Sequence, residues 1–231
     1  MSRPVAVIAG ANVGLGSAIA EALGARGYAV VALGRDAATR AVVAEVSATR
    51  ALACDLTSAD DVERAFSTIE RDLGTASVVI YNAHIIELAS SADTTLERFE
   101  EAWRVNCFGA VVVAKRALAP MRARGEGTLV FSGATGSLRG GKRSLAFSSS
   151  KFALRGVAQS LARELAPTGI HVVHVVLDGL VWSERSRARF QAVEAEAMAP
   201  HAIAATYLAL IDQERSAWTH EIDLRPWRER F

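Results

Sequence analysis

Five short apolar runs, rich in β-branched residues, recur along the chain, and segments with helical periodicity separate them. They are VAVIAG (5–10), YAVVALG (28–34), SVVIYNA (77–83), TLVFSG (128–133) and IHVVHVV (170–176). A run that is apolar at almost every position predicts a strand buried on both faces, which is typical of a parallel sheet covered by helices. Strands that alternate with helices in this way predict an α/β fold.

The length and composition of the chain predict one domain. Its 231 residues, of which 51% are hydrophobic, suffice to bury one sizeable core. We therefore expect a single domain over residues 1–231. The segment RARFQAVEAEAMAPHA (187–202) follows the fifth apolar run and breaks the alternation. We interpret it as part of a substrate lid around residues 180–200, over the carboxyl ends of the strands. The alternative is a helix exposed to solvent.

Charge and cysteine content argue against several classes of protein. Lys and Arg number 26 against 25 Asp and Glu, which gives a formal net charge of +1. Because there are no blocks of like charge, a nucleic-acid partner is not expected. Cys54 and Cys107 belong to no CxxC or Cys/His cluster, which favours reduced thiols in a cytoplasmic protein. The N-terminal apolar run is too short for a secretory signal or a membrane span, so no membrane partner is expected.

The first candidate site is the stretch AGANVGLG (9–16), between the first apolar run and a helical segment. Gly10, Gly14 and Gly16 lack a Cβ atom, so the backbone can turn tightly and a diphosphate can approach the N–H groups at the start of the helix. The spacing is GxxxGxG rather than the GxGxxG of most dinucleotide-binding folds. A tight turn without a ligand is the alternative.

This turn is followed by CDL (54–56), YNA (81–83), VNCFGA (105–110) and a helix that carries Lys151. The ordered set resembles the short-chain dehydrogenase/reductase family over essentially the whole chain. The resemblance implies a single Rossmann-type domain of three layers, with a seven-stranded parallel sheet, a nicotinamide dinucleotide cofactor and a small-molecule substrate.

The resemblance also implies roles for individual residues. Asp55 would meet the adenine edge, Asn82 and Ala83 would line the adenosine ribose, and Lys151 would hold the nicotinamide ribose. Asn106 matches the asparagine that kinks a long helix and anchors a water in the family's proton relay. The full set of expected cofactor contacts in these motifs is Gly10, Asn12, Gly14, Leu15, Gly16, Asp55, Leu56, Asn82, Ala83 and Lys151.

The choice of dinucleotide depends on charge after the second apolar run, where the chain reads ALGRD (32–36). The position at which members that use NAD carry an acid is Gly34, and Arg35 follows it. A guanidinium there can bind a 2′-phosphate through two charge-assisted hydrogen bonds. We therefore expect NADP(H) rather than NAD(H). Arg35 as a solvated loop residue is the alternative, and Asp36, which could reach the ribose instead, is expected to cap the following helix.

The departures from the family pattern gather where a substrate would bind. Phe147 stands four residues before Lys151, in the place of the catalytic tyrosine, and Ala134, or Gly133 in another alignment, stands in the place of the catalytic serine. Because a phenyl ring has no proton to give, another group must donate one if the protein reduces carbonyls. Positioning of the reactants alone can contribute about 7–11 kcal/mol, so hydride transfer can survive the loss.

Several side chains are candidate proton donors, and each has a structural alternative. His84 replaces the glycine of the family's Asn-Asn-Ala-Gly element and has a suitable unperturbed pKa, although a loop histidine is more often a surface residue. Asp178 follows the fifth apolar run, where it could instead bond to a backbone turn. Lys151 could donate directly if burial lowers its pKa. The remaining candidates are the hydroxyls of Ser132, Thr135 and Ser137, with capping and turn formation as their alternatives.

No metal site is predicted, because His171 and His174 are three residues apart on an expected strand and so point to opposite faces. Three functions remain open. The first is an NADP(H)-dependent oxidoreductase that acts on a small carbonyl, imine or enone with a non-standard proton donor. The second is a non-redox enzyme, namely a cyclase, dehydratase or isomerase on the same scaffold. The third is a cofactor-binding pseudoenzyme.

The resemblance further implies a homodimer or homotetramer, since members of the family commonly associate through two long helices, here about 94–119 and 145–166. The alternative is that the apolar residues of these helices pack only on the sheet. Those expected on the outward faces are Trp103, Phe108, Val112, Phe152 and Leu161.

Overall fold

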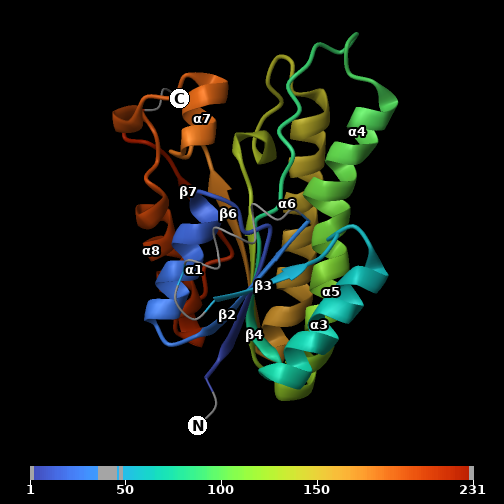
Figure 1. The fold of residues 1–231 in the computed structure, drawn as a ribbon, viewed down its shortest axis with the longest axis vertical. Coiled ribbons are helices and arrows are strands. Elements are labelled where there is room, and N and C mark those ends of the chain that lie inside the picture. The colour runs from blue at the N-terminus through green and yellow to red at the C-terminus, as the bar shows by residue number, and fades with distance from the viewer. Residues whose placement is uncertain (1–2, 36–45, 47–48, 229–231) are drawn as a thin grey trace.

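One parallel sheet of seven strands forms the centre of the molecule (Figure 1). The computed structural model describes residues 3–35, 46 and 49–228. The strand order is β3-β2-β1-β4-β5-β6-β7, and every neighbouring pair is parallel. The strands are β1 (Val5–Ala9), β2 (Ala29–Gly34), β3 (Thr49–Ala53), β4 (Ala76–Tyr81), β5 (Gly127–Ser132), β6 (Ile170–Leu177) and β7 (Glu221–Leu224). The predicted α/β fold with seven parallel strands is confirmed.

Helices cover both faces of this sheet. On one face lie α1 (Leu15–Ala25) and α8 (Pro200–Ile211), which pack against each other. On the other lie α3 (Ala59–Asp72), α5 (Gly109–Arg124) and α6 (Leu145–Leu165), with α4 (Leu96–Trp103) packed on α6 (Figure 1). The short α7 (Glu184–Phe190) lies above α8, at the end of the molecule toward which β6 points (Figure 1). In the described part of the chain, no helix combines the length and apolar character needed to cross a bilayer.

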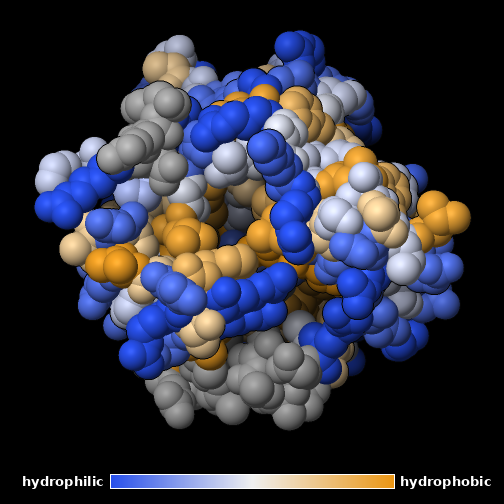
Figure 2. Space-filling model, turned by 90° about the horizontal axis from the view of Figure 1, so that it is seen from above, coloured by the Kyte–Doolittle hydropathy of each residue, from blue (hydrophilic) through white to orange (hydrophobic). Residues whose placement is uncertain are grey.

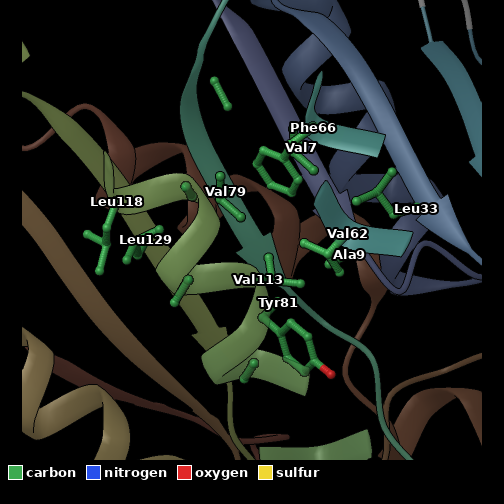
Figure 3. Packing of buried hydrophobic residues seen from close by; sticks show 14 of the residues in the cluster. Val7, Ala9, Leu33, Val62, Phe66, Val79, Tyr81, Val113, Leu118 and Leu129 are labelled. Atoms are coloured by element: carbon green, nitrogen blue, oxygen red, sulfur yellow. The ribbon is translucent and has the colours of Figure 1, made fainter. Parts of the chain in front are cut away.

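Successive side chains of the central strands enter two separate hydrophobic clusters, because strand side chains alternate between faces. Val7 and Ala9 of β1 face α3 and α5, whereas Ala6 and Ile8 face α1 and α8. Figure 3 shows the first cluster, in which Phe66 of α3 packs beside Val7. Both faces of the central strands are therefore buried, which is why they are apolar at nearly every position.

One strand differs in character from the central strands. β3 reads TRALA and most of its residues are partly or fully exposed, because it forms an edge of the sheet. The apolar pattern did not predict it. The helix expected from AATRAVVAEV (37–46), together with its expected cap Asp36, falls largely outside the described residues.

The turn after β1 requires glycine at position 10, and this requirement can be tested. Gly10 has a φ of +91°, and a Cβ there would lie 2.3 Å from the backbone N of Ala83. Gly27 has a similar φ of +87° but no heavy atom within 4 Å of such a Cβ. We expect Gly27→Ala to cost about 1–2 kcal/mol from backbone strain alone, and Gly10→Ala to cost about 1–3 kcal/mol more from overpacking.

Urea denaturation of the two variants measures this difference directly. Gly27→Ala is the matched control, since it carries the strain without the clash. Equal destabilisation of the two proteins would show that the close approach of the turn to Ala83 has no energetic weight.

Candidate active site

A cavity of about 540 Å³ opens at the carboxyl ends of the strands, and its lining comes from segments far apart in the sequence. Figure 2 looks down on this end of the molecule and shows a hollow with hydrophobic walls and hydrophilic residues around it. No Asp or Glu is among the described residues that line it. They are Asn12, Val13, Gly14, Leu15, Asn82, His84, Ile86, Leu88, Ser132, Gly133, Ala134, Thr135, Phe147, Lys151, Leu177, Gly179, Leu180, Val181, Trp182, Ser183, Arg185, Ser186, Arg189 and Phe190.

The glycine-rich turn forms one wall of the cavity. Asn12, Gly14 and Leu15 line it, and α1 begins at Leu15. The buried amide of Asn82 at the end of β4 donates to the Gly10 carbonyl at 3.1 Å, which ties the turn to the next strand. A helix N-terminus that opens on a cavity offers unpaired N–H groups and the positive end of a dipole, so the turn can hold a diphosphate.

Three other predicted cofactor residues lie away from this cavity lining, on the β2 and β3 side. Arg35 is exposed immediately after β2. Asp55 accepts hydrogen bonds from the backbone N and the hydroxyl of Thr57, at 2.9 and 2.8 Å, and so stabilises the turn before α3. Leu56 is buried in the core cluster that faces α3.

Phe147 and Lys151 lie one turn apart on α6, and both line the cavity. Lys151 is only 2% exposed, and its ammonium donates to the Ser132 carbonyl oxygen at 2.8 Å. Burial lowers the pKa of Lys151 to about 8, slightly opposed by the neighbouring Cys107. A lysine in this environment can release a proton near neutral pH.

The loop after β5 carries Gly133 and Ala134, the two positions that the sequence aligns with the family's serine. A Cβ at Gly133 would lie 2.3 Å from Nε2 of His174, which is fully buried in β6. A side chain therefore has no room at position 133 unless His174 moves. Gly133 and Ala134 both line the cavity, and Ala134 already carries a Cβ there.

Asn106 lies in a π-helical turn, Arg104–Phe108, that interrupts the long helix between α4 and α5. Its side chain pairs with both backbone groups of Ile85, at 2.7 and 3.0 Å, and donates to the Ser150 hydroxyl of α6 at 2.8 Å. Tyr81, at the end of β4, donates to the Val105 carbonyl at 2.5 Å. Its hydroxyl thus satisfies a carbonyl of the irregular turn, which gives a structural reason for tyrosine at this position.

His84 lines the cavity, and its lowered pKa disfavours the hypothesis that it donates the proton. Its Nδ1 lies 3.1 Å from the Asn82 carbonyl oxygen, which can only accept, so Nδ1 carries the hydrogen and Nε2 the lone pair. Surrounding protein and then the charge of Lys151 hold the pKa of His84 below its usual value. The ring is therefore neutral at pH 7 and its remaining nitrogen is an acceptor.

The geometry of Asp178 also contradicts its predicted role as an acid. Its carboxylate is 1% exposed and pairs with Arg139 at 3.1 and 3.2 Å and with Arg225 at 3.1 Å. Burial alone would raise the pKa of Asp178, but hydrogen bonds from Thr135 and Arg139 and the arginine charges outweigh it, so the pKa is lowered. Asp178 instead joins the end of β6 to two loops.

The three hydroxyl candidates are engaged elsewhere. Ser132 pairs with the buried hydroxyl of Tyr207 at 2.9 Å, Thr135 bonds to Asp178, and Ser137 accepts from the Ala134 backbone N at 3.2 Å. Each bond fixes the loop between β5 and α6. The Ser137 bond is the turn interaction given above as an alternative, whereas Ser132 and Thr135 make tertiary contacts with α8 and with the end of β6.

Sequence reasoning expected a lid around residues 180–200 but did not single out the side chains of α7 within it. Trp182, Arg185, Arg189 and Phe190 line the cavity from this helix and the residue pair before it. The i, i+4 spacing of the two arginines was visible in ERSRARF (184–190), but only the tertiary fold brings this segment opposite the glycine-rich turn. No group of three or more potential metal ligands occurs among the described residues.

Comparison with known proteins adds a family to this geometry. Residues 4–193 match the family model for short chain dehydrogenases. The 3-oxoacyl-[acyl-carrier-protein] reductase MabA of Mycobacterium avium is 31% identical over 198 residues, which are 86% of this chain and 74% of that protein. An uncharacterized oxidoreductase of Staphylococcus aureus is 27% identical over 229 residues, 98% of each chain.

Two solved structures are similar over nearly the whole chain. The short-chain dehydrogenase from Rhodopseudomonas palustris has a TM-score of 0.84 and 33% identity, and the match covers 97% of this chain and 99% of that one. A variant of actinorhodin polyketide ketoreductase with NADPH has a TM-score of 0.89 and 24% identity, with 98% of each chain covered, which is a likeness of fold. With its glycine-rich turn, its buried lysine on α6 and this coverage, the chain belongs to the short-chain dehydrogenase/reductase family of oxidoreductases.

Proposed function

We propose that the protein is an NADP(H)-dependent oxidoreductase that reduces a small apolar carbonyl, imine or enone, with Lys151 as the proton donor. The observation that carries this proposal is the buried ammonium of Lys151, which lines the cavity with no carboxylate among the cavity-lining residues and has a pKa lowered to about 8. Such an ammonium is a strong enough acid to give up a proton at neutral pH, and hydroxyls stand at neither family position.

Different residues around the cavity would hold the cofactor, donate the proton and contact the substrate. A bound reduced nicotinamide would supply the hydride. Asn12, Gly14 and Leu15 would hold its diphosphate at the start of α1. The Lys151 ammonium would give its proton to the oxygen or nitrogen of the reduced acceptor and become neutral until solvent returns the proton. Phe147 would offer an apolar wall to the body of the substrate.

We expect NADPH to bind at least tenfold more tightly than NADH, a difference of about 1.4 kcal/mol or more. Arg35 follows β2, exposed, where a 2′-phosphate would lie in this family. Titration of both cofactors against protein fluorescence measures the ratio. Arg35→Ala is expected to weaken NADPH binding and leave NADH binding unchanged. Equal affinities in the native protein would contradict the proposed preference.

We further propose that residues 180–200 act as a lid. Residues 179–183 and several positions of α7 line the cavity, and Val181 pairs with Met198 across the segment. Arg189 donates to the Ile86 carbonyl at 2.6 Å, on the opposite side of the cavity mouth. This contact joins the lid to the loop after β4.

We propose a homodimer or homotetramer through α4, α5 and α6, in a cytoplasmic protein. Trp103 and Phe152 are 39% and 43% exposed, and Trp103 stacks on Phe108 with ring centroids 5.9 Å apart. Val112 and Leu161, in contrast, pack against the core. Sedimentation velocity at micromolar protein would distinguish the oligomer from a monomer.

The free thiols of Cys54 and Cys107 support a reducing compartment.

The test of the proposed reaction is consumption of NADPH with a panel of ketones, quinones, cyclic imines and enones. Deuterated NADPH identifies the reaction, because a reductase transfers the deuterium to its product. Phe147 and Ala134 favour two alternatives, a non-redox enzyme and a pseudoenzyme that keeps the cofactor site. Product formation without cofactor oxidation would identify the non-redox enzyme, and NADPH binding without any product would identify the pseudoenzyme.

A further inference from the structure

The charges around the cavity are all of one sign. Lys151, Arg185 and Arg189 line it, and no Asp or Glu does so among the described residues. Arg185 and Arg189 are exposed at the mouth, while Lys151 lies buried beside the Ser132 carbonyl. The walls between these cations are apolar, with Ile86, Leu88, Leu180 and Phe190 among them. A cavity of this kind favours a ligand that is apolar in its body and negatively charged at one end.

The two arginines of α7 share one face of the helix, because they are four residues apart. Arg187, on another face, pairs with Glu184, and neither of these two lines the cavity. Like charges at this spacing destabilise a helix. In the described part of the chain Arg185 pairs with no acid that would offset this repulsion. The segment therefore keeps two repelling cations at the cavity, where an anion would relieve them.

Arg189 is already oriented for binding. One Nη atom donates to the Ile86 carbonyl at 2.6 Å, and the guanidinium carbon lies 5.1 Å from the centre of the Phe190 ring. A guanidinium has five N–H groups, so these contacts leave donors for a ligand. Because its rotamer is held by the backbone and by the ring, little side-chain entropy remains to be lost on binding.

We propose that Arg185 and Arg189 bind an anionic group of the substrate, a carboxylate or phosphate carried by an apolar body in the cavity. This inference rests on the proposed function, since it assigns the substrate of that same site. A second anion, the diphosphate of the cofactor, would bind close to these arginines. Ser183, just before α7, lies against the glycine-rich turn, where a Cβ on Gly14 would be 3.3 Å from the Ser183 Cβ. The cofactor's diphosphate would lie at this turn, so the test must separate the two anions.

Isothermal titration of octanoate and of octanamide into the native protein, with and without NADPH, is the experiment. The two probes have the same chain and differ in charge. We expect octanoate to bind at least tenfold more tightly than octanamide. Arg185→Ala and Arg189→Ala should each weaken octanoate binding about fivefold or more and leave octanamide unchanged. Arg187→Ala, on the same helix but paired with Glu184, is the matched control and should change neither.

The outcomes separate the possible errors. Equal binding of octanoate and octanamide would overturn the inference. Loss of NADPH affinity in Arg185→Ala and Arg189→Ala, with octanoate binding intact, would assign the guanidinium groups to the cofactor's diphosphate and would also overturn it. If octanoate binding depends on the two arginines while no compound of the panel oxidises NADPH, the anion site stands and the proposed reductase function fails.

Discussion

Phe147→Tyr combined with Ala134→Ser is expected to raise NADPH-dependent reduction of simple ketones by one to several orders of magnitude. A positioned general acid contributes roughly 10²–10⁴-fold, and a hydrogen bond to the developing oxyanion about 10²–10³-fold. Both residues line the cavity, and Lys151 lies one turn from the new tyrosine, where its charge would lower the phenol pKa. The measurement is kcat/KM for a small aliphatic ketone.

Phe147→Tyr alone is expected to gain less ketone reductase activity than the double variant. A buried hydroxyl without a partner costs about 1–3 kcal/mol, and without the serine the tyrosine has no second group to share the oxyanion. Phe152→Tyr is the matched control, because Phe152 lies on the same helix but is 43% exposed and does not line the cavity. If the double variant binds NADPH normally and gains no ketone reduction, the cavity is shaped for non-redox chemistry and the reductase proposal loses to that alternative.

Turnover of the native protein is expected to fall as the pH rises through about 8, because the acid form of Lys151 is then lost. The sign follows from the role: a general acid must hold its proton, and burial has lowered the pKa of this group from its ordinary value to about 8. Lys151→Arg keeps a positive charge and a donor for the Ser132 carbonyl, but a guanidinium releases no proton in this range. We expect turnover to fall by about 10²-fold or more in this variant.

The readout that separates proton donation from simple positioning is the pH profile. In Lys151→Arg the residual rate should no longer decline near pH 8, while NADPH binding should change only a few fold. Lys142→Arg, at an exposed position in the loop before α6, makes the same chemical change outside the cavity and serves as control. Two results would show that Lys151 is not the proton donor. One is a native pH profile that is flat from pH 6 to 10, and the other is a Lys151→Arg profile that still declines near pH 8.

Much of this protein follows from local sequence alone. Strands buried on both faces must be apolar at nearly every position, so β1, β2, β4, β5 and β6 were predictable without tertiary information. The glycine-rich turn was predictable for a similar reason, since the close approach of Gly10 to Ala83 admits no side chain. The edge strand β3 was not, because exposure on one side removes the apolar pattern.

Only the tertiary structure shows what surrounds each candidate acid and so on which of them the proposal of a proton donor can rest. The sequence offers His84, Asp178 and Lys151 as candidate proton donors. The protonation state of each depends on neighbours that the fold brings from distant segments. Two arginines hold Asp178 ionised, the Asn82 carbonyl sets the tautomer of the neutral His84 ring, and burial acidifies Lys151. The position of α7 is a second case, because the sequence spacing of Arg185 and Arg189 places them on one helix face but only the packing of that helix over the strand ends turns the face toward the cavity. The local pattern of apolar residues thus specifies the strands and helices, whereas the electrostatic environment of a site is the sum of contacts between residues far apart in the sequence.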